Sequence, residues 1–314
     1  MSPSEEAPSL PLWVLVGPTG SGKSALAIEV ARASSERGQP VEIISADAMQ
    51  LYRGMDIGTA KVAVSERGGI PHHLLDVWTP DTPASVEEYQ RMARDQILDC
   101  HRRGVIPLLV GGSGLYVSAV VYDFDFPGHD PETRQRLEQI FENEGLGPLV
   151  SELRQRAPEF APSIDLDNPR RVIRALEIID HTGKPPIAGL DARGQWWHKP
   201  TRIVGLDADR EWLVERINLR VSQMWQVGLV AEVMSVRNGV GFGPTAAQAI
   251  GYREVISHLD GELSEHEAKE LVAQHTRRYA RKQLSWFRRD ENIRWLRVPH
   301  PDIASQARGI FEGG

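Results

Sequence analysis

The chain has 314 residues, 41% hydrophobic and 25% charged, which is enough to bury one sizeable core and a smaller second unit. Its formal net charge of −7 does not indicate a nucleic-acid-binding protein, and the single cysteine, Cys100, excludes an internal disulfide and every multi-cysteine metal site. Residues 1–11 lack a basic segment, and the apolar run after them is too short to be a signal or to span a membrane. We therefore expect a cytoplasmic protein without a membrane segment.

Short β-branched runs alternate with longer helical patterns in the first half of the chain. The predicted strands are Leu12–Val16, Val41–Ile44 and Ile106–Val110, and the predicted helices are Ser24–Ser35 and Val86–Arg103. Alternation of this kind is typical of an α/β fold, in which a parallel sheet is flanked by helices.

The pattern then changes to amphipathic helices interrupted by glycine and proline, which we interpret as an inserted all-helical domain. A further predicted strand, Arg202–Asp207, and two long helical stretches, Glu211–Arg237 and Ser264–Arg288, restore the first pattern. The core is therefore predicted to be split in sequence. Its two parts and the insertion are residues 1–128 and 201–314, and residues 129–200.

One segment between a predicted strand and a predicted helix matches the phosphate-binding pattern G-x-x-x-x-G-K-[ST]. It consists of Gly17, Pro18, Thr19, Gly20, Ser21, Gly22, Lys23 and Ser24. Backbone N–H groups and the positive end of the helix would face an oxyanion, Lys23 would add a point charge, and the Ser24 hydroxyl is a candidate Mg²⁺ ligand. The fold class is therefore predicted to be a P-loop NTPase-like α/β sheet.

This loop, the usual ATP-binding P-loop motif, recognises phosphate groups and not ATP as such. An ATPase would place a metal-binding aspartate at the end of an apolar strand. The predicted strand Ile106–Val110 instead runs into Gly111, Gly112 and Ser113. The sequence therefore predicts a phosphate site without the rest of an ATP-hydrolysing centre.

Three polar residues are candidates for chemistry beside this loop. Asp47 follows the strand Val41–Ile44 at the carboxyl edge of the predicted sheet, where ligands bind in open α/β folds. It is either a proton acceptor or a turn and helix-cap residue. Ser113 is either a substrate-orienting hydroxyl or a turn residue. Arg220 borders the apolar stripe of its helix, where it either reaches an anion or packs its stem on the surface.

Two groups of basic residues stand out in this acidic chain. One lies along one face of a predicted helix, and the other begins a predicted helix. They are Arg277, Arg278, Arg281, Lys282, Arg288 and Arg289 near the C-terminus, and Arg170, Arg171 and Arg174 in the insertion. Either group alone is consistent with a solvated helix face. Two of them in a chain of negative net charge favour a polyanionic partner.

Taken in order, these segments resemble the tRNA dimethylallyltransferase family along nearly the whole chain. The resemblance is carried by Gly17–Ser24, Ile44–Asp47 with Gln50 and Tyr52, Gly54–Lys61, Gly111–Tyr116, Asn168–Glu177, Ile250–Glu254, and Thr276–Gln283 with Trp286 and Phe287. The phosphate loop is generic, whereas residues 47–61 and 276–289 are specific to this family. The chain departs from it at Ala48, where serine is common, at Ser113, which replaces threonine, and at Arg278 and Lys282.

The resemblance implies transfer of a dimethylallyl group from dimethylallyl diphosphate to N6 of adenine 37, in tRNAs that read codons beginning with U, with Mg²⁺ as cofactor. It implies that Asp47 is the base or hydrogen-bond partner of N6, that Ser113 contacts substrate and that Arg220 neutralises the diphosphate. The implied contacts with the tRNA anticodon stem-loop are Asp47, Ala48, Met49, Gln50, Arg134, Arg170, Arg171, Arg174, Gln248, Thr276, Arg277, Arg278, Arg281, Lys282 and Gln283. Nothing in the sequence requires more than a monomer.

Three other functions stay open from the residues alone. A P-loop small-molecule kinase would hold ATP in the same loop, and a prenyltransferase acting on free adenine nucleotides would use the same donor. A non-catalytic RNA-binding module would leave the phosphate loop and Asp47 without a purpose.

Overall fold

The computed structural model describes residues 10–123, 126–128, 130–186 and 195–314. The chain divides into two compact units, one formed by Met1–Val121 with Trp196–Gly314 and the other by Tyr122–Gln195. Each unit buries a hydrophobic cluster of its own. The second unit overlaps the predicted insertion, residues 129–200.

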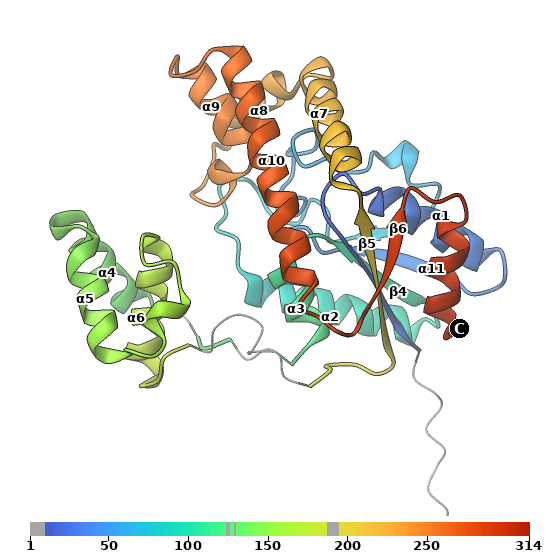
Figure 1. The fold of residues 1–314 in the computed structure, drawn as a ribbon, viewed down its shortest axis with the longest axis horizontal. Coiled ribbons are helices and arrows are strands. Elements are labelled where there is room, and N and C mark those ends of the chain that lie inside the picture. Colours follow the sequence, from blue (N-terminus) through green and yellow to red (C-terminus); the bar gives the residue numbers. More distant parts are fainter. Residues whose placement is uncertain (1–9, 124–125, 129, 187–194) are drawn as a thin grey trace, which may run out of the picture. The chain divides into compact units, whose positions relative to one another are not determined.

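The larger unit is built on a six-stranded parallel sheet with the strand order β3-β2-β4-β1-β5-β6 (Figure 1). The strands are β1 (Leu12–Val16), β2 (Val41–Ser45), β3 (His72–His73), β4 (Ile106–Gly111), β5 (Thr201–Ala208) and β6 (Ile293–Val298). Strands β1, β2 and β4 are buried at every position, which explains why they carry apolar residues on both faces, with Glu42 and Ser45 as the buried polar residues of β2. The predicted fold class, a parallel sheet flanked by helices with an all-helical insertion, is confirmed.

The register of the sheet brings the carboxyl ends of its central strands together. Val16 of β1 lies opposite Gly111 of β4 and Gly205 of β5, and Ser45 of β2 lies opposite Val110. Each loop that follows these strands therefore begins at the same edge, which is where ligands bind in open α/β sheets.

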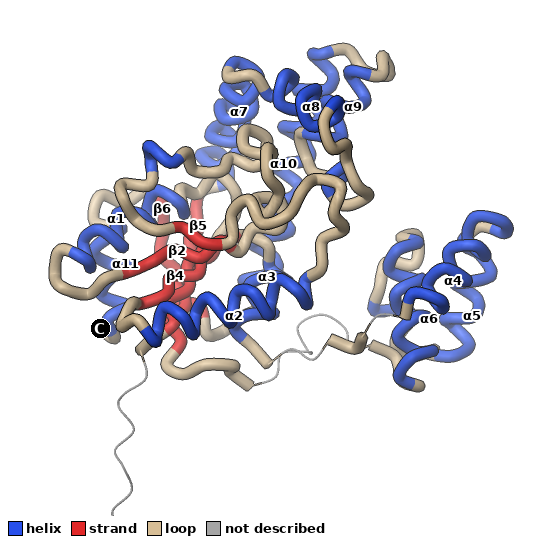
Figure 2. The backbone as a smooth tube through the Cα atoms, turned by 180° about the vertical axis from the view of Figure 1, so that it is seen from behind, coloured by secondary structure: helices blue, strands red, loops and turns tan. Residues whose placement is uncertain are grey.

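Helices pack on both faces of the sheet (Figures 1 and 2). Helices α1 (Lys23–Ser35) and α11 (Ile303–Glu312) share one face, where Trp13 of β1 stacks on Phe311 with ring centroids 5.0 Å apart. Helices α2 (Val86–Arg102) and α3 (Gly114–Val121) pack on each other and on β4. Helices therefore cover both faces of the sheet.

Four further helices follow β5, namely α7 (Arg210–Gln226), α8 (Leu229–Asn238), α9 (Tyr252–Leu259) and α10 (Glu265–Phe287). The single helix expected over Glu211–Arg237 is interrupted, because Gly228 adopts a left-handed conformation with φ of 105°. Helix α10 begins with a capping box, in which the Ser264 hydroxyl accepts from the Glu267 N–H and the Glu267 carboxylate accepts from the Ser264 N–H.

The smaller unit consists of α4 (Pro131–Glu144), α5 (Leu146–Arg156) and α6 (Pro169–Thr182), with an apolar cluster between them. Glu177 of α6 is fully buried, and its carboxylate pairs with Arg134 at 3.4 Å and Arg174 at 3.0 Å. A buried carboxylate needs such partners, since an unpaired charge is costly to desolvate.

Among the described residues of both units, no helix has the length and apolar character that a membrane crossing requires.

Candidate active site

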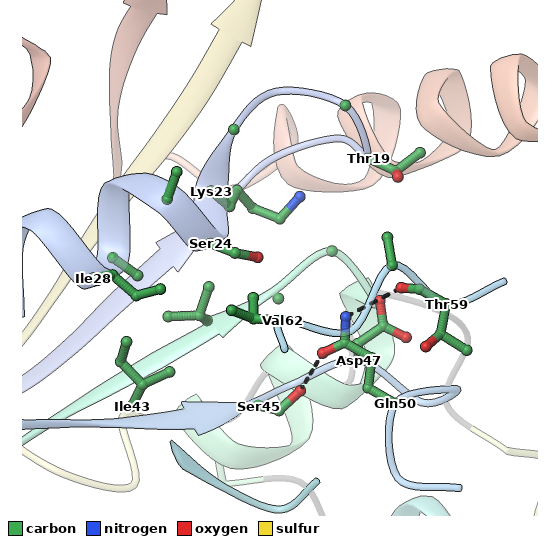
Figure 3. Close-up of a pocket in the computed structure, with 18 of the residues that line it drawn as sticks. Thr19, Lys23, Ser24, Ile28, Ile43, Ser45, Asp47, Gln50, Thr59 and Val62 are labelled. Carbon is green, nitrogen blue, oxygen red and sulfur yellow. Dashed lines mark hydrogen bonds between the residues drawn. The ribbon is translucent and has the colours of Figure 1, made fainter. Parts of the chain in front are cut away.

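The loops at the carboxyl ends of β1, β2 and β4 surround a cavity of about 370 Å³ in the larger unit (Figure 3). Its polar lining includes Thr19, Lys23, Ser24, Asp47, Arg220 and Gln283. The structure therefore brings the predicted phosphate loop together with Asp47 and with an arginine some 200 positions away in the sequence. Residues that were predicted separately form one site.

The phosphate loop curls around its own Pro18 carbonyl. The Ser21 hydroxyl and the Lys23 ammonium each donate to Pro18 O at 2.8 Å. Helix α1 begins at Lys23, directly after Gly22 in the left-handed conformation, so its positive end faces the cavity. Lys23 and Ser24 both point into this space (Figure 3). The arrangement is that of an oxyanion site at a helix N-terminus.

Two arginines on successive turns of α7 hold the loop from outside. Arg220 Nη1 donates to Thr19 Oγ1 at 3.0 Å, and Arg216 Nε donates to Gly20 O at 2.8 Å while its guanidinium lies 4.8 Å from the centre of the Trp212 ring. Arg216 was not among the site residues predicted from the sequence. The signal that identifies it is the i, i+4 spacing from Arg220, which puts both side chains on one helix face.

Burial and neighbouring positive charges lower the pKa values of two cations in this site, Lys23 and Arg220. Burial, and then the charge of Arg220, lower the pKa of Lys23 to about 7, against the opposite effect of the Asp47 carboxylate. Burial, followed by the charge of Arg216, lowers the pKa of Arg220. Positive groups gathered in this way gain stability when an anion binds between them.

Asp47 is held in a tight turn after β2, and its Oδ1 accepts from the Met49 N–H at 3.0 Å. Burial raises its pKa, while the hydrogen bonds from the Met49 and Gln50 N–H groups and the charge of Lys23 oppose this effect. Asp47 is thus both a turn residue and a carboxylate lining the cavity. A raised pKa brings a carboxylate closer to the range in which a general base works.

Ser113 connects the Asp47 turn with α10. Its Oγ accepts from the Ala48 N–H at 3.3 Å and lies 3.3 Å from the Tyr279 hydroxyl. Tyr279 was not among the predicted site residues, and its hydroxyl lies beside the site next to Ser113. Burial raises the pKa of Tyr279 to about 12, so the hydroxyl stays protonated at neutral pH.

A chain of hydrogen bonds fixes the wall of the cavity next to Asp47. The Ser45 hydroxyl donates to Gln50 Oε1 at 3.1 Å, and Gln50 Nε2 donates to Thr59 O at 3.2 Å (Figure 3). Gln50, expected at the tRNA, therefore lines the cavity together with Thr59. Its amide connects the β2 turn with the following loop.

Gln283 was also expected to contact tRNA, yet its side chain is 4% exposed and lines the cavity. Its Oε1 accepts from the Thr19 N–H at 2.8 Å. A Cβ on Gly112 would lie 2.3 Å from Gln283 Nε2, so this glycine is what lets α10 approach the loop. No spacing in the sequence connects residues so far apart.

The remaining predicted tRNA contacts lie in different surroundings. Arg278, Arg281 and Lys282 are exposed on α10, and Gln248 is exposed in the short helix η4 (Ala246–Gln248). Arg277 donates to Asn218 Oδ1 at 2.6 Å, and the Thr276 hydroxyl to Val272 O at 2.7 Å. Arg170 and Arg171 are exposed on α6, whereas Arg134 and Arg174 pair with the buried Glu177.

The IPP transferase family model matches residues 50–290 of this chain. A tRNA dimethylallyltransferase of Thermobifida fusca is 49% identical over 294 residues, covering 93% of this chain and 92% of its own, and one of Salinispora arenicola is 50% identical over 283 residues, covering 90% and 81%.

Two solved structures are also similar. The full-length tRNA isopentenylpyrophosphate transferase of Bacillus halodurans has a TM-score of 0.70 at 36% identity, covering 97% of this chain and 96% of its own. A eukaryotic dimethylallyltransferase acting on tRNA has a TM-score of 0.78 at 26% identity, covering 96% and 78%.

Proposed function

The chain belongs to the IPP transferase family, and we propose that it transfers a dimethylallyl group from dimethylallyl diphosphate to N6 of adenine 37, in tRNAs that read codons beginning with U, with release of diphosphate. It is a prenyl-transferring enzyme of tRNA modification. The observation that carries the proposal is the cavity in which a phosphate loop with clustered cations faces the half-buried carboxylate of Asp47. A protein acting on tRNA would work in the cytoplasm, and we propose that it acts as a monomer.

Leaving-group stabilisation is the main catalytic contribution in this proposal. The diphosphate would accept hydrogen bonds from the loop N–H groups and face Lys23, Arg220 and the N-terminus of α1. As the allylic C–O bond breaks, the electron pair moves onto the diphosphate oxygen. Preorganised positive groups stabilise that developing charge without having to reorganise.

The residues present fit the Mg²⁺ that the resemblance implies. The Ser24 hydroxyl lies at the start of α1 and lines the cavity, and a hard oxygen donor of this kind is what Mg²⁺ prefers. Ser24 would hold the ion together with diphosphate oxygens. A bound Mg²⁺ would neutralise part of the diphosphate charge.

Asp47 would act on the acceptor. An adenine in an anticodon loop is stacked, so it must be extruded before N6 can reach the donor carbon, at a cost of a few kcal/mol. As the N6–C bond forms, N6 loses a proton, and Asp47 is the carboxylate beside the phosphate loop that would accept it. Ser113, through the Ala48 N–H, would hold the Asp47 turn in place.

The tRNA backbone would be held by exposed basic residues. Arg278, Arg281 and Lys282 lie on α10, the same helix that reaches the phosphate loop through Gln283. Arg170 and Arg171 are the corresponding exposed residues of the smaller unit. Contacts to phosphates supply affinity without reading sequence, as an enzyme for several tRNAs requires.

The experiment that tests this function is nucleoside mass spectrometry on unmodified tRNA after incubation with the protein, Mg²⁺ and dimethylallyl diphosphate, with ATP replacing the donor in a parallel reaction. A dimethylallyl mass increment on adenosine with the prenyl donor alone is the expected result. ATP turnover without an increment would favour a kinase. An increment on AMP offered in place of tRNA, with none on tRNA, would favour a nucleotide prenyltransferase.

A further inference from the structure

Glu232 of α8 binds a loop that is distant in sequence through three consecutive backbone N–H groups. Its Oε2 accepts from Asp56 N at 2.9 Å and Ile57 N at 2.8 Å, and its Oε1 accepts from Gly58 N at 3.2 Å. Successive N–H groups pointing at one carboxylate form an anion-binding concavity in the backbone. The loop of residues 54–61 is therefore shaped around the Glu232 side chain.

Tyr252 of α9 completes this arrangement. Its hydroxyl donates to Glu232 Oε1 at 2.5 Å, and its ring lies where a Cβ on Gly58 would fall, 2.4 Å from Tyr252 Cε2. The tyrosine is fully buried, and burial together with the Glu232 charge raises the pKa of its hydroxyl, which keeps it a donor. Glu232 and Tyr252 thus hold the loop by its backbone and leave its side chains to face elsewhere.

The same loop forms part of the cavity wall. Thr59 and Ala60 line the cavity, as does Val62 directly after the loop, and Thr59 O accepts from Gln50 Nε2. From within the loop, Lys61 donates to Tyr52 O at 2.8 Å and pairs with Asp56 and Asp76. A shift of the backbone at residues 56–58 would move this part of the wall.

The groups that bind phosphate come from other elements. They are the loop of residues 17–24 and the arginines of α7, whose hydrogen bonds within the described part of the chain go to partners other than Glu232. The 54–61 loop contributes instead a hydroxyl, a methyl group and, with Val62, a branched apolar side chain. Such a surface suits the hydrocarbon part of the donor and not its diphosphate.

We propose that Glu232 is a positioning residue for the prenyl end of the donor: its carboxylate, oriented by Tyr252, fixes the backbone of residues 56–58 and thereby places Thr59 and Ala60 against the reacting carbon chain. This proposal rests on the function proposed above. Glu232 touches no substrate and acts only through the loop that it binds.

The test compares two ligands on the Glu232→Gln variant, namely dimethylallyl diphosphate and inorganic diphosphate. The glutamine keeps the volume but replaces one acceptor oxygen with an NH₂ group, so at least one backbone N–H of the loop loses its acceptor and the anchor is weakened. We expect the KM and Kd for dimethylallyl diphosphate to rise about 10-fold or more, as for a small misplacement of a positioned reactant. The Kd for inorganic diphosphate and the KM for tRNA should stay within about twofold.

Glu215→Gln, an exposed position on α7, is the matched control and should behave as the parent protein. Tyr252→Phe keeps the ring over Gly58 and removes one hydrogen bond, so we expect a smaller rise in donor KM, of about three-fold. The double variant should resemble Glu232→Gln alone, because the hydroxyl acts through that carboxylate.

Equal KM values for dimethylallyl diphosphate in Glu232→Gln and the parent would overturn the inference. It would also be overturned if dimethylallyl diphosphate and inorganic diphosphate both bound more weakly by the same factor and the Tm fell. Because both outcomes are measured against an active parent, they leave the proposed function intact. An inactive parent would instead refute that function.

Discussion

Gln283 of α10 and Thr19 of the phosphate loop are 264 positions apart in the sequence, and a hydrogen bond of 2.8 Å joins the Gln283 side chain to the Thr19 backbone. The same helix carries Arg278, Arg281 and Lys282 on its exposed surface. One rigid element thus extends from the proposed tRNA-binding surface to the proposed donor site. Binding of tRNA along α10 would therefore affect the position of the loop that holds the diphosphate.

Replacement of Asp47 by asparagine should lower kcat by about 10²–10⁴, because the amide cannot accept the N6 proton. The Kd for tRNA should remain within about twofold of the parent value. Since burial raises the Asp47 pKa, the ionised form appears only as the pH rises through that value, and the rate of the parent should rise with it. Single-turnover rates from acid to neutral pH would show this limb in the parent and not in the variant.

Asp95→Asn makes the same chemical change at an exposed position of α2, and this control should keep the rate of the parent protein. A variant at Asp47 with the parent's rate would remove this residue from the proton-accepting role.

Donor binding should be coupled to proton uptake by Lys23. Its pKa of about 7 means that this lysine is mostly neutral at pH 8 and mostly charged well below pH 7. A bound diphosphate favours the ammonium form and raises the pKa, so we expect uptake of roughly one proton per donor bound at pH 8. Calorimetric titrations with dimethylallyl diphosphate in two buffers of different ionisation enthalpy would measure it.

Lys23→Arg is the matched variant, because arginine is charged throughout this pH range. Identical binding enthalpies in both buffers for the parent would contradict the assignment.

Loss of the Arg220 guanidinium should impair leaving-group stabilisation. Arg220→Ala is expected to reduce kcat by about 10²–10³, the usual effect of removing one preorganised donor from a developing charge. Arg216→Ala should have a smaller effect, because that side chain contacts a backbone carbonyl and the Trp212 ring. Arg210→Ala, exposed on the same helix, serves as control. A variant at Arg220 that raised only the KM for tRNA would assign this residue to the acceptor instead.

The parts of the fold that could be predicted were those with a strong local pattern. Strands β1, β2, β4 and β5 carry apolar runs because the sheet is covered on both faces. Strand β3 has two residues and was missed, and β6 was missed because Arg294 and Arg297 interrupt its apolar residues. An edge strand exposed in this way resembles an ordinary surface segment.

The site was predictable where a motif or a strand end marks it. Residues 17–24 and Asp47 depend on local spacing, and the sequence placed both at the same sheet edge. Gln283 acts across 264 positions through one hydrogen bond to Thr19, and Glu232 acts across 174 to 176 positions through the N–H groups of three consecutive residues. Only the tertiary fold connects such residues, because a glutamine or glutamate on a helix is by itself an ordinary surface residue.

Charge reversal on α10 should weaken binding of every tRNA to a similar degree. Arg278→Glu combined with Arg281→Glu removes two exposed cations, and the slope of log K against log salt should decrease by about one for each phosphate that is no longer neutralised. Fluorescence anisotropy with an anticodon stem-loop over a salt series would measure both quantities. Arg37→Glu combined with Arg294→Glu, both at exposed positions away from α10, changes the net charge by the same amount and is the control. An unchanged slope would place the tRNA elsewhere on the protein.

Gly112→Ala should act on the donor site through Gln283. The new Cβ would lie 2.3 Å from Gln283 Nε2, so the amide has to withdraw, which breaks its hydrogen bond to Thr19. A single hydrogen bond of this kind contributes about 1 kcal/mol, so the KM for dimethylallyl diphosphate should rise roughly five-fold in steady-state assays. Gln283→Ala removes the same bond without the clash and should raise that KM by a similar factor.

The double variant Gly112→Ala with Gln283→Ala distinguishes a steric clash from the absence of this hydrogen bond. If the amide is the common element, the two effects do not add, and the KM of the double variant equals that of Gln283→Ala alone. The Tm should fall most in Gly112→Ala alone, because only in that variant do the new Cβ and the Gln283 amide compete for the same space. Additive effects on KM would instead show that Gly112 acts on the phosphate loop independently, through the Gly17 carbonyl oxygen that its Cβ would approach to 3.1 Å.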